Sequence, residues 1–582
     1  MSDFLKHYTL SYTPLSPIHV GTGDSYEPTN YVIDDGTLYE FDTGGALAAL
    51  TESDRNELNK IVNARANEDM LKAVQRFFYD RREALKPWAV NAIPVLEGVV
   101  GLYSKRVGQT ANREGGGGQV LNKLEIDRTA YNPINRQPVL FGSSIKGAIR
   151  TALLSHVNDK KPLSRQDEEK FVLENLDQGE RKRREREQKK VFPKLNESLF
   201  EFRAGKFELD PMRLLQIADA AWMSNDEFPT AQVLISVNRK KELKRDKSGN
   251  EIFGQAEKNE NLCKLLESIP AWRYRAFSGQ LNLQNVVDIR SSDKLPNAKL
   301  LFKIEQIAKY CSKHYLPILK AEMKIMRDRG FLDSEWDSNI QTLLGKMADK
   351  LLNGQAFLLR VGRHSGAESV TIEGVRHIKI MKGNPEYQPQ TKTLWLAAND
   401  PKQRSNLLPF GWLLVEIHSG NAPVSDWPEL AELCQSQQTQ ARQWAEKYAN
   451  QKTQLAAKRQ AAELRRQQEE SEHRQRFELE QAEKHARLAK QQADEQRRAA
   501  MSPEQLQIEA LRQQLEQKQT GNLREQIGGP LYGDLRKLIE QTTDWSPESK
   551  TELLVVAKSV LEFIGAGGNK KAKELLKNLI SE

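Results

Sequence analysis

The chain has 582 residues, 38% of them hydrophobic, and its 87 basic and 79 acidic residues give a formal net charge of +8. This length allows two or more buried cores, and the small charge excess excludes polyanion binding except where basic residues are locally concentrated. The 3 cysteines form no CxxC pair, which argues against a disulfide framework or a cysteine zinc site, and neither a signal-peptide pattern nor a membrane-spanning apolar run is present. We therefore expect a cytoplasmic protein of several domains with no membrane association.

The first part of the chain, residues 1–155, predicts an α+β unit. HYTLSYTPLSPIHV at 7–20 is typical of an interrupted strand, and it ends in the GTG of residues 21–23. YVIDDGTLYEFD at 31–42 contains Asp35-Gly36, the signature of a tight hairpin, and a helical pattern follows from 51 to 84. A run of four glycines at 115–118 lies in a polar stretch and predicts a flexible loop.

Residues 138–154, PVLFGSSIKGAIRTALL, join a short apolar run to a helical pattern. Free backbone N–H groups at the helix start, two hydroxyls and two cations four residues apart could hold a phosphate. The same pattern suits an ordinary serine-capped helix after a strand, so the segment alone leaves both interpretations open. The residues concerned are Gly142, Ser143, Ser144, Lys146, Gly147 and Arg150.

A charged segment, residues 156–215, predicts a helical insertion. It contains RKRREREQKK at 181–190, the densest positive run of the chain. Such a run is typical of a solvated helix face, and charge alone binds nucleic acid without regard to sequence. We therefore favour the insertion over a binding groove.

Residues 216–425 predict a second α+β part. Within it, Trp272 and Tyr274 alternate with Arg273 and Arg275. As a strand, this stretch would place the two aromatic residues on one face and the two arginines on the other, where they could contact phosphate.

A second glycine-rich loop follows an apolar strand at 357–361. Two glycines that bracket Arg-His-Ser can bring backbone N–H groups and polar side chains close to a phosphate or a sugar. His364 could instead be a general base, but no nucleophile or orienting carboxylate lies near it in the sequence, so we favour binding. The loop comprises Gly362, Arg363, His364, Ser365 and Gly366.

The composition changes near residue 426 to Gln, Ala, Arg, Lys and Glu. Residues 426–520 predict a long, largely exposed helix that breaks near Ser502-Pro503, because the scattered apolar residues form no coiled-coil seam. Residues 521–582 predict a small module of three short helices, at 531–539, at 547–564 with Ser546 as its cap, and at 569–580.

Taken in order, SPIHVGTG, NYVIDDGTLYEFD, PVLFGSSIKGAIRTALL and LLRVGRHSGAESVT resemble the RAMP proteins of type III CRISPR effector complexes. The likeness is greatest to the family of the fifth Csm subunit of type III-A complexes, and it spans roughly residues 7–420. It implies an α+β fold of the ferredoxin-like, RNA-recognition type, with an antiparallel sheet, helices and large insertions, in one or two such units. The long helix and the C-terminal bundle fall outside it.

The resemblance also implies a function in antiviral defence. It implies a non-catalytic, cofactor-free and metal-free RNA-binding subunit of the Csm ribonucleoprotein complex, which caps the backbone filament at the 3′ end of the guide (CRISPR) RNA and aids guide maturation and assembly. The implied partners are the guide RNA, the backbone RAMP subunits, the small helical subunits as further candidates, and target RNA indirectly. The implied RNA contacts are His19, Gly21, Gly23, Gly142, Ser143, Ser144, Lys146, Gly147, Gly362, Arg363, His364, Ser365 and Gly366, to which the charge pattern adds Arg150, Arg273 and Arg275.

Two alternatives remain at this point. A guide-RNA-processing endoribonuclease of the same superfamily would use His19 or His364 as general acid or base, with Lys146 or Arg363 steadying the cleaved phosphate. Such enzymes typically end in a glycine-rich loop, whereas this chain ends in KELLKNLISE. A helical scaffold that recruits other subunits would instead place the function in residues 426–582. We expect the non-catalytic subunit.

Overall fold

The computed structural model describes residues 4–580, with gaps at 65–66, 110–111, 114–119, 122–123, 174–175, 225–226, 255–256, 258–261, 287–293, 381–385, 421–423, 522 and 524. The glycine run at 115–118 therefore lies outside the described residues. The chain forms two units, Met1–Ala462 (unit 1) and Glu463–Glu582 (unit 2). The finer division into five parts stays a prediction.

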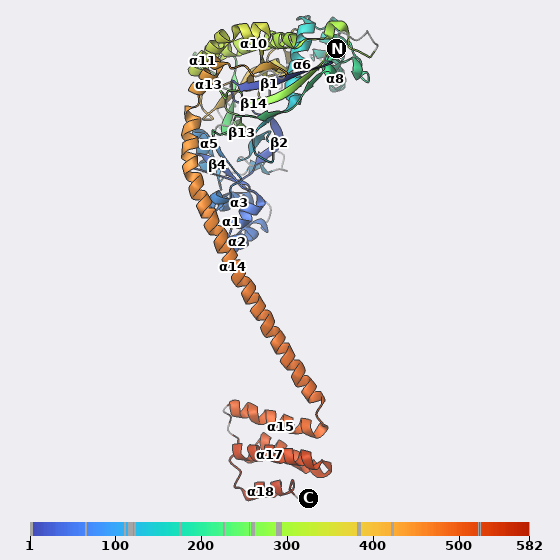
Figure 1. The fold of residues 1–582 in the computed structure, drawn as a ribbon, viewed down its shortest axis with the longest axis vertical. Helices are drawn as coiled ribbons and strands as arrows, with labels where there is room; N and C mark the ends of the chain where they lie inside the picture. The colour runs from blue at the N-terminus through green and yellow to red at the C-terminus, as the bar shows by residue number, and fades with distance from the viewer. Residues whose placement is uncertain are drawn as a thin grey trace. The chain divides into compact units, whose positions relative to one another are not determined.

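Unit 1 contains a seven-stranded antiparallel sheet, of which Figure 1 labels β1 and β14. Tyr12 of its strand β1 is paired with Phe277 of β14 and Val415 of β19, so the first strand lies between two strands from distant parts of the chain. From edge to edge the strands are β15 (Ala356–Arg360), β19 (Trp412–Ser419), β1 (Leu5–Pro14), β14 (Phe277–Gln284), β11 (Ala220–Trp222) and β9 (Val139–Leu140), and β10 (Leu215–Ile217) also pairs with β14.

Two helices, α6 (Gly142–Asn158) and α10 (Ile304–Asp328), pack on each other and on β15. Their apolar side chains and those of the strands form the largest hydrophobic core of unit 1. α10 reaches this core because its apolar residues recur every three or four positions, which places them on one face. These residues are Ile304, Ile307, Ala308, Cys311, Tyr315 and Leu319.

A second, five-stranded sheet has the order β18 (Thr393–Ala398), β12 (Gln232–Lys240), β13 (Lys264–Ser268), β8 (Ile126–Thr129) and β2 (Gly21–Tyr26). β8 runs parallel to β13, and the other pairs are antiparallel. A third sheet contains β3 (Tyr31–Asp34), β4 (Thr37–Glu40) and β5 (Asn91–Pro94). Asp35 and Gly36 have φ angles of 47° and 72°, which confirms the predicted hairpin turn.

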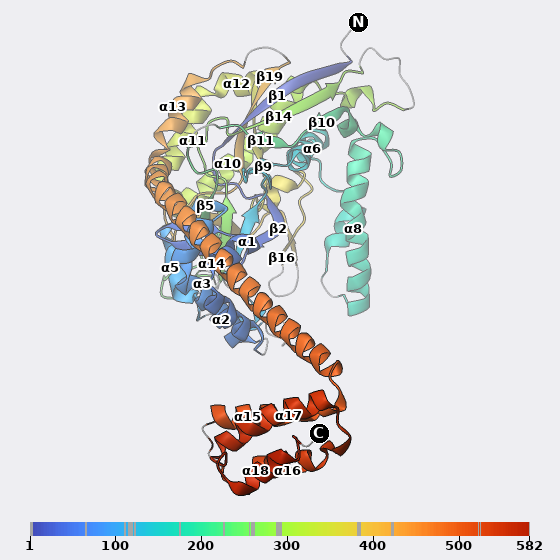
Figure 2. The ribbon, with the colours of Figure 1, turned by 60° about the horizontal axis from the view of Figure 1, so that its bottom comes forward.

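The remaining elements of unit 1 surround these sheets. The charged run at 181–190 lies on α8 (Gln178–Leu199), which begins with a capping box at Asp177 and is seen in Figure 2. Its Val191 is buried in the largest core of unit 1. The elements are α1 (Thr43–Ala49), α2 (Glu52–Val62), α3 (Glu68–Asp80), α4 (Arg82–Leu85), α5 (Glu97–Arg106), β6 (Asn112–Arg113), β7 (Val120–Leu121), α7 (Arg165–Glu168), α8 (Gln178–Leu199), α11 (Ser334–Lys346), α12 (Ala348–Asn353), β16 (Ile378–Ile380), β17 (Glu386–Gln388) and α13 (Pro428–Ser436).

The long polar helix is α14 (Thr439–Ala499), and its first part packs on unit 1. Trp444 stacks on Tyr448 at 4.8 Å and donates a 3.2 Å hydrogen bond to the hydroxyl of Thr37. Lys447 forms a 2.7 Å ion pair with Asp35. α14 has no buried residue, so the prediction of a largely exposed helix is confirmed for α14, although several side chains of its first part are half-buried.

Unit 2 contains a helical bundle (Figure 2). Ser502 caps α15 (Pro503–Thr520), which confirms the predicted helix break. The three short helices are confirmed as α16 (Pro530–Glu540), α17 (Pro547–Phe563), capped by Ser546, and α18 (Lys570–Lys577). α15 also contributes Ile508, Leu511 and Leu515 to the core of the bundle. The sequence pattern instead predicts these residues as part of the long, largely exposed helix.

The predicted α+β class with a helical C-terminal part is confirmed. Among the described residues, no helix has the length and apolar character needed to cross a membrane.

Candidate nucleic-acid interface

Backbone hydrogen bonds join the three glycine-containing segments that the sequence motifs predict as RNA contacts. The N–H of Arg363 donates to the carbonyl of His19 at 2.8 Å, and the N–H of Ala130 donates to the carbonyl of Val20 at 2.6 Å. The N–H of Val139, at the start of β9, donates to the carbonyl of Ala130 at 2.9 Å. Since α6 begins two residues after β9, one hydrogen-bonded path leads from the GRHSG loop through residues 19–20 to the start of α6.

His19 supports this path from inside the protein. Its side chain is 0% exposed, and its Nδ1 lies 2.7 Å from the carbonyl oxygen of Glu267. Burial lowers the pKa of His19, and its Nε2 has no hydrogen-bond partner among the described residues. A Cβ on Gly21 would lie 3.1 Å from this Nε2. His19 therefore packs under the GTG segment and does not present its ring to a ligand.

The GTG segment itself is exposed. It begins β2, the edge strand of the five-stranded sheet, whose pairing with β8 is irregular between Gly21 and Ser25. Gly23 has φ +91°, and a Cβ at this position would meet nothing within 4 Å. An exposed edge strand without side chains allows another backbone or a phosphate to approach closely.

The GRHSG loop is fixed at both ends of its Arg-His-Ser core. Gly362 has φ +81°, and a Cβ on it would lie 2.4 Å from the carbonyl oxygen of His19, so this position requires glycine. Gly366 also has a positive φ, and the side chain of Ser365 is buried. Arg363 is 40% exposed and forms an ion pair with Asp127 at 2.5 Å. Among the Arg-His-Ser side chains, that of Arg363 is the one exposed on the surface.

His364 points into the protein. Its ring stacks on Trp395 at 4.7 Å, and its Nε2 is buried without a hydrogen-bond partner among the described residues. Burial lowers the pKa of His364 to about 3, and nearby cationic groups, Arg363 first among them, act in the same direction. The imidazole is therefore neutral at pH 7.

The start of α6 differs from both interpretations of the sequence. Phe141 occupies the N-cap position with no side-chain cap, so the ordinary serine-capped helix is wrong, and Ser143 and Ser144 lie in the first turn. The N–H of Gly142 donates to the Asp219 carboxylate at 2.7 Å. Asp219 therefore occupies one of the donors expected to be free for phosphate.

Lys146 and Arg150 have different environments on α6. Arg150 forms a 2.8 Å ion pair with Asp210 and lies over Phe200, so it stabilises the fold. Lys146 has no ion pair in the part of the chain that the structure describes, and burial lowers its pKa. Gly147 beside it is exposed, and a Cβ at this position would meet nothing within 4 Å.

The strand predicted around Arg273 and Arg275 is wrong. The segment is a turn between β13 and β14, in which Trp272 and Arg275 have φ angles of 58° and 45°. Arg273 is 1% exposed and donates a 3.0 Å hydrogen bond to the carbonyl of Pro229. Arg275 donates to the Glu416 carboxylate at 2.6 Å. Both arginines thus stabilise the fold, and their alternation does not create a phosphate-binding face.

Sequence reasoning missed two carboxylates of the site. Asp127 pairs with Arg363 and Asp219 accepts from the N–H of Gly142, and neither lies near its partner along the chain. Also missed was His314 of α10, whose lone position in an apolar helix gives no signal. A group of three or more His, Cys, Asp or Glu side chains able to hold a metal ion does not occur among the described residues.

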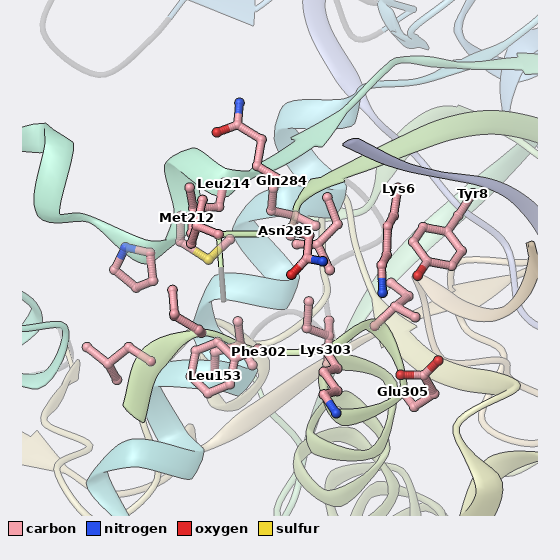
Figure 3. A pocket seen from close by; sticks show the side chains of 18 residues that line it. Lys6, Tyr8, Leu153, Met212, Leu214, Gln284, Asn285, Phe302, Lys303 and Glu305 are labelled. Atoms are coloured by element: carbon pink, nitrogen blue, oxygen red, sulfur yellow. The ribbon is translucent and has the colours of Figure 1, made fainter. Parts of the chain in front are cut away.

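A small cavity lies between the start of β1, the end of β14 and the start of α10 (Figure 3). Lys6, Tyr8, Asn285 and Glu305 line it together with apolar side chains such as Leu153. Its volume of about 100 Å³ is below the roughly 300 Å³ of the smallest typical ligand pockets. It is therefore too small for a nucleotide.

The family model of the RAMP superfamily matches residues 11–327, more than half of the chain. The chain belongs to the RAMP superfamily. None of the curated proteins matches it.

The solved structures that are similar to the chain include the following two. One is from a cryo-EM structure of a Csm–crRNA–target RNA ternary complex of a type III-A CRISPR-Cas system, with 17% identity, a TM-score of 0.40, and coverage of 71% of this chain and 100% of that one. The other is the crystal structure of T. onnurineus Csm5, with 16% identity, a TM-score of 0.38, and coverage of 70% and 99%.

Proposed function

We propose that the chain is a non-catalytic RNA-binding subunit of a type III-A CRISPR (Csm) complex, which caps the backbone filament at the 3′ end of the guide RNA. Membership of the RAMP superfamily supports an RNA-binding role, and the four ordered sequence motifs support the particular subunit. The observation that carries the proposal is the hydrogen-bonded path from Arg363 through His19 and Val20 to β9 and α6, because it brings the three motif segments together.

The accessible groups along this path suit an RNA backbone. Arg363 is exposed, and Lys146 lacks an ion pair among the described residues. A lysine without an ion pair is available to a phosphate, and hydrogen bonds between charged partners are about twice as strong as neutral ones. Gly21, Gly23 and Gly147 add exposed backbone without side chains. Contacts of this kind hold RNA in position without reading its bases.

The histidines give little support to the endoribonuclease alternative. A general acid or base must reach the proton it transfers, and it works best with a pKa near the operating pH. The ring of His19 is buried against Glu267 and Gly21, and burial lowers its pKa. The ring of His364 stacks on Trp395 and has a pKa of about 3. We therefore favour a non-catalytic role for both.

Incubation of the purified protein with repeat RNA in EDTA tests this choice, and the RNA should remain intact. Cleavage that disappears in His19→Ala or His364→Ala would establish the endoribonuclease instead. Co-purification from the native host tests the assignment to a complex. We expect the chain to arrive with small RNA and with sister RAMP subunits, and its recovery without either would contradict the proposal.

A further inference from the structure

We propose that a cavity beneath the GRHSG loop binds one nucleotide. The cavity lies between α10, residues 360–376 and β18, and its volume is about 450 Å³. This volume falls within the roughly 300–1,000 Å³ of pockets that take one small molecule. The cavity shares His364 and Gly366 with the proposed RNA-binding loop but is lined mainly by residues outside the family motifs.

Three residues that line this cavity carry buried polar atoms without hydrogen-bond partners among the described residues. His314 of α10 is 5% exposed, and neither ring nitrogen makes a hydrogen bond of normal geometry within the described residues, although the Ser369 backbone lies near. Nε2 of His364 and Nε of Arg376 are also buried without a hydrogen-bond partner there. Buried polar groups are normally satisfied, so a set of unsatisfied ones around a cavity indicates a missing ligand.

The charges favour an anionic ligand. The carboxylate of Glu368 is paired with Lys241 at 2.6 Å, and that of Glu322 with Arg360 at 2.7 Å. Glu373 lies 3.4 Å from Lys160. Arg376 forms no ion pair within 4 Å among the described side chains; burial lowers its pKa, and the nearby carboxylates of Glu373 and Glu368 only partly offset this effect. A phosphate placed at Arg376 would supply the counter-charge.

The two histidines favour a heteroaromatic base over a simple anion. Burial lowers the pKa of His314 to about 4, so both His314 and His364 are neutral at pH 7. A neutral imidazole offers one donor and one acceptor, which match the mixed donors and acceptors along a base edge. Inorganic phosphate would fill little of the cavity and would leave these nitrogens unpaired. A nucleoside monophosphate unit supplies both a phosphate for Arg376 and a base for the two histidines.

The nucleotide could come from the end of a bound RNA or from a free mononucleotide. The RNA source rests on the proposed function, whereas the cavity and its unpartnered groups do not. Calorimetric titration of the full chain with AMP, GMP, CMP and UMP therefore tests the site, and inorganic phosphate is titrated in parallel. We expect saturable binding of at least one nucleotide.

Two variants and a control test the location. Arg376→Gln should weaken nucleotide binding about tenfold or more, because it removes a charge-assisted contact. Ala321→Trp places a large side chain at an exposed position of the cavity lining and should abolish binding without altering a buried group. Lys324→Gln, an exposed change on the same helix outside the lining, should leave binding unchanged.

Lack of saturable binding by all four nucleotides at millimolar concentration would overturn the proposal. Equal affinity for inorganic phosphate, or full binding by Ala321→Trp, would overturn it as well. Competition with an RNA oligonucleotide separates the two sources. Displacement of the nucleotide by the RNA would identify an RNA end as the ligand, and a lack of displacement would identify a free nucleotide. RNA binding that survives in Arg376→Gln would leave the proposed function intact whichever result the nucleotide titration gives.

Discussion

The backbone N–H of Arg363 donates a 2.8 Å hydrogen bond to the carbonyl oxygen of His19, although the two residues are far apart in the sequence. Gly362 makes this contact feasible, because a Cβ at that position would lie 2.4 Å from the same oxygen. The glycine-rich loop is thus attached to the end of the first strand segment by its backbone. The side chain of Arg363 is exposed to solvent, whereas that of His364 points into the protein and stacks on Trp395.

Gly362→Ala should destabilise unit 1 by about 2 kcal/mol or more, because it combines left-handed backbone strain with a clash against His19. Urea unfolding followed by tryptophan fluorescence measures the change. Gly147→Ala is the matched control. It lies in the exposed face of α6 with φ in the helical region, so it should stabilise the protein by about 0.5–1 kcal/mol. Equal stability of the two variants would contradict the packing role of Gly362.

Lys146→Glu and Arg363→Gln should each weaken RNA binding for all sequences and lower the slope of log K against log salt by about 1. The reason is that phosphate contacts release counter-ions but carry no base information. Arg165→Glu gives a charge reversal at a side chain that is 95% exposed and off the path, and it should have a smaller effect. A salt slope unchanged by Lys146→Glu would remove Lys146 from the interface.

The fold around this interface could be predicted wherever local signals decide it. Asp35-Gly36 forms a hairpin turn through its own backbone conformation, and Ser546 caps α17 by accepting from the N–H of Ser549, three residues on. Arg273 and Arg275 were mispredicted because their environment depends on Pro229 and Glu416, which only the folded chain brings near.

The same limit applies to the candidate site. The glycine-rich segments were found because left-handed and closely packed backbone positions leave a glycine signature. Asp219 was not found, because it lies 77 residues from Gly142 in the sequence and no local pattern marks its carboxylate as the acceptor for the Gly142 N–H. The cavity at His314 depends on how α10 packs on residues 360–376, which no local pattern encodes.

The stability of unit 1 should fall as the pH is lowered from about 6.5, and His314 should account for part of the loss. Its pKa of about 4 in the folded protein is below that of an unfolded histidine, so the unfolded chain binds the proton first. The stabilisation is present above the unfolded pKa and is lost progressively down to about pH 4. Arg376 lowers the pKa further, while Glu373 opposes this effect.

His314→Phe isolates that contribution. Between pH 7 and pH 5 the variant should lose up to about 2 kcal/mol less unfolding free energy than the wild type. The comparison between the two proteins is the test, because Glu267, whose pKa burial raises to about 7, changes stability in the opposite direction. Identical pH dependence in variant and wild type would contradict a neutral buried His314.

Trp444→Ala should destabilise unit 1 by about 1–2 kcal/mol, because it removes an aromatic stack on Tyr448 and a hydrogen bond to Thr37. Phe477→Ala is the control on the same helix, since Phe477 is exposed and should matter little. Thermal unfolding of the two variants gives the difference. Equal melting temperatures would show that the first part of α14 does not stabilise unit 1.

Deletion of residues 463–582 separates RNA binding from scaffolding. The cut preserves the part of α14 that packs on unit 1, whereas a cut at 425 would also remove Tyr448 and Leu455, which pack against the core near α3. RNA affinity should survive the deletion after Ala462, because Lys146, Arg363 and the glycine segments all lie before it. Filament capping, measured by reconstitution with sister subunits, should survive as well. Loss of assembly with intact RNA binding would instead assign the scaffold function to unit 2, and loss of RNA binding itself would contradict the interface proposed here.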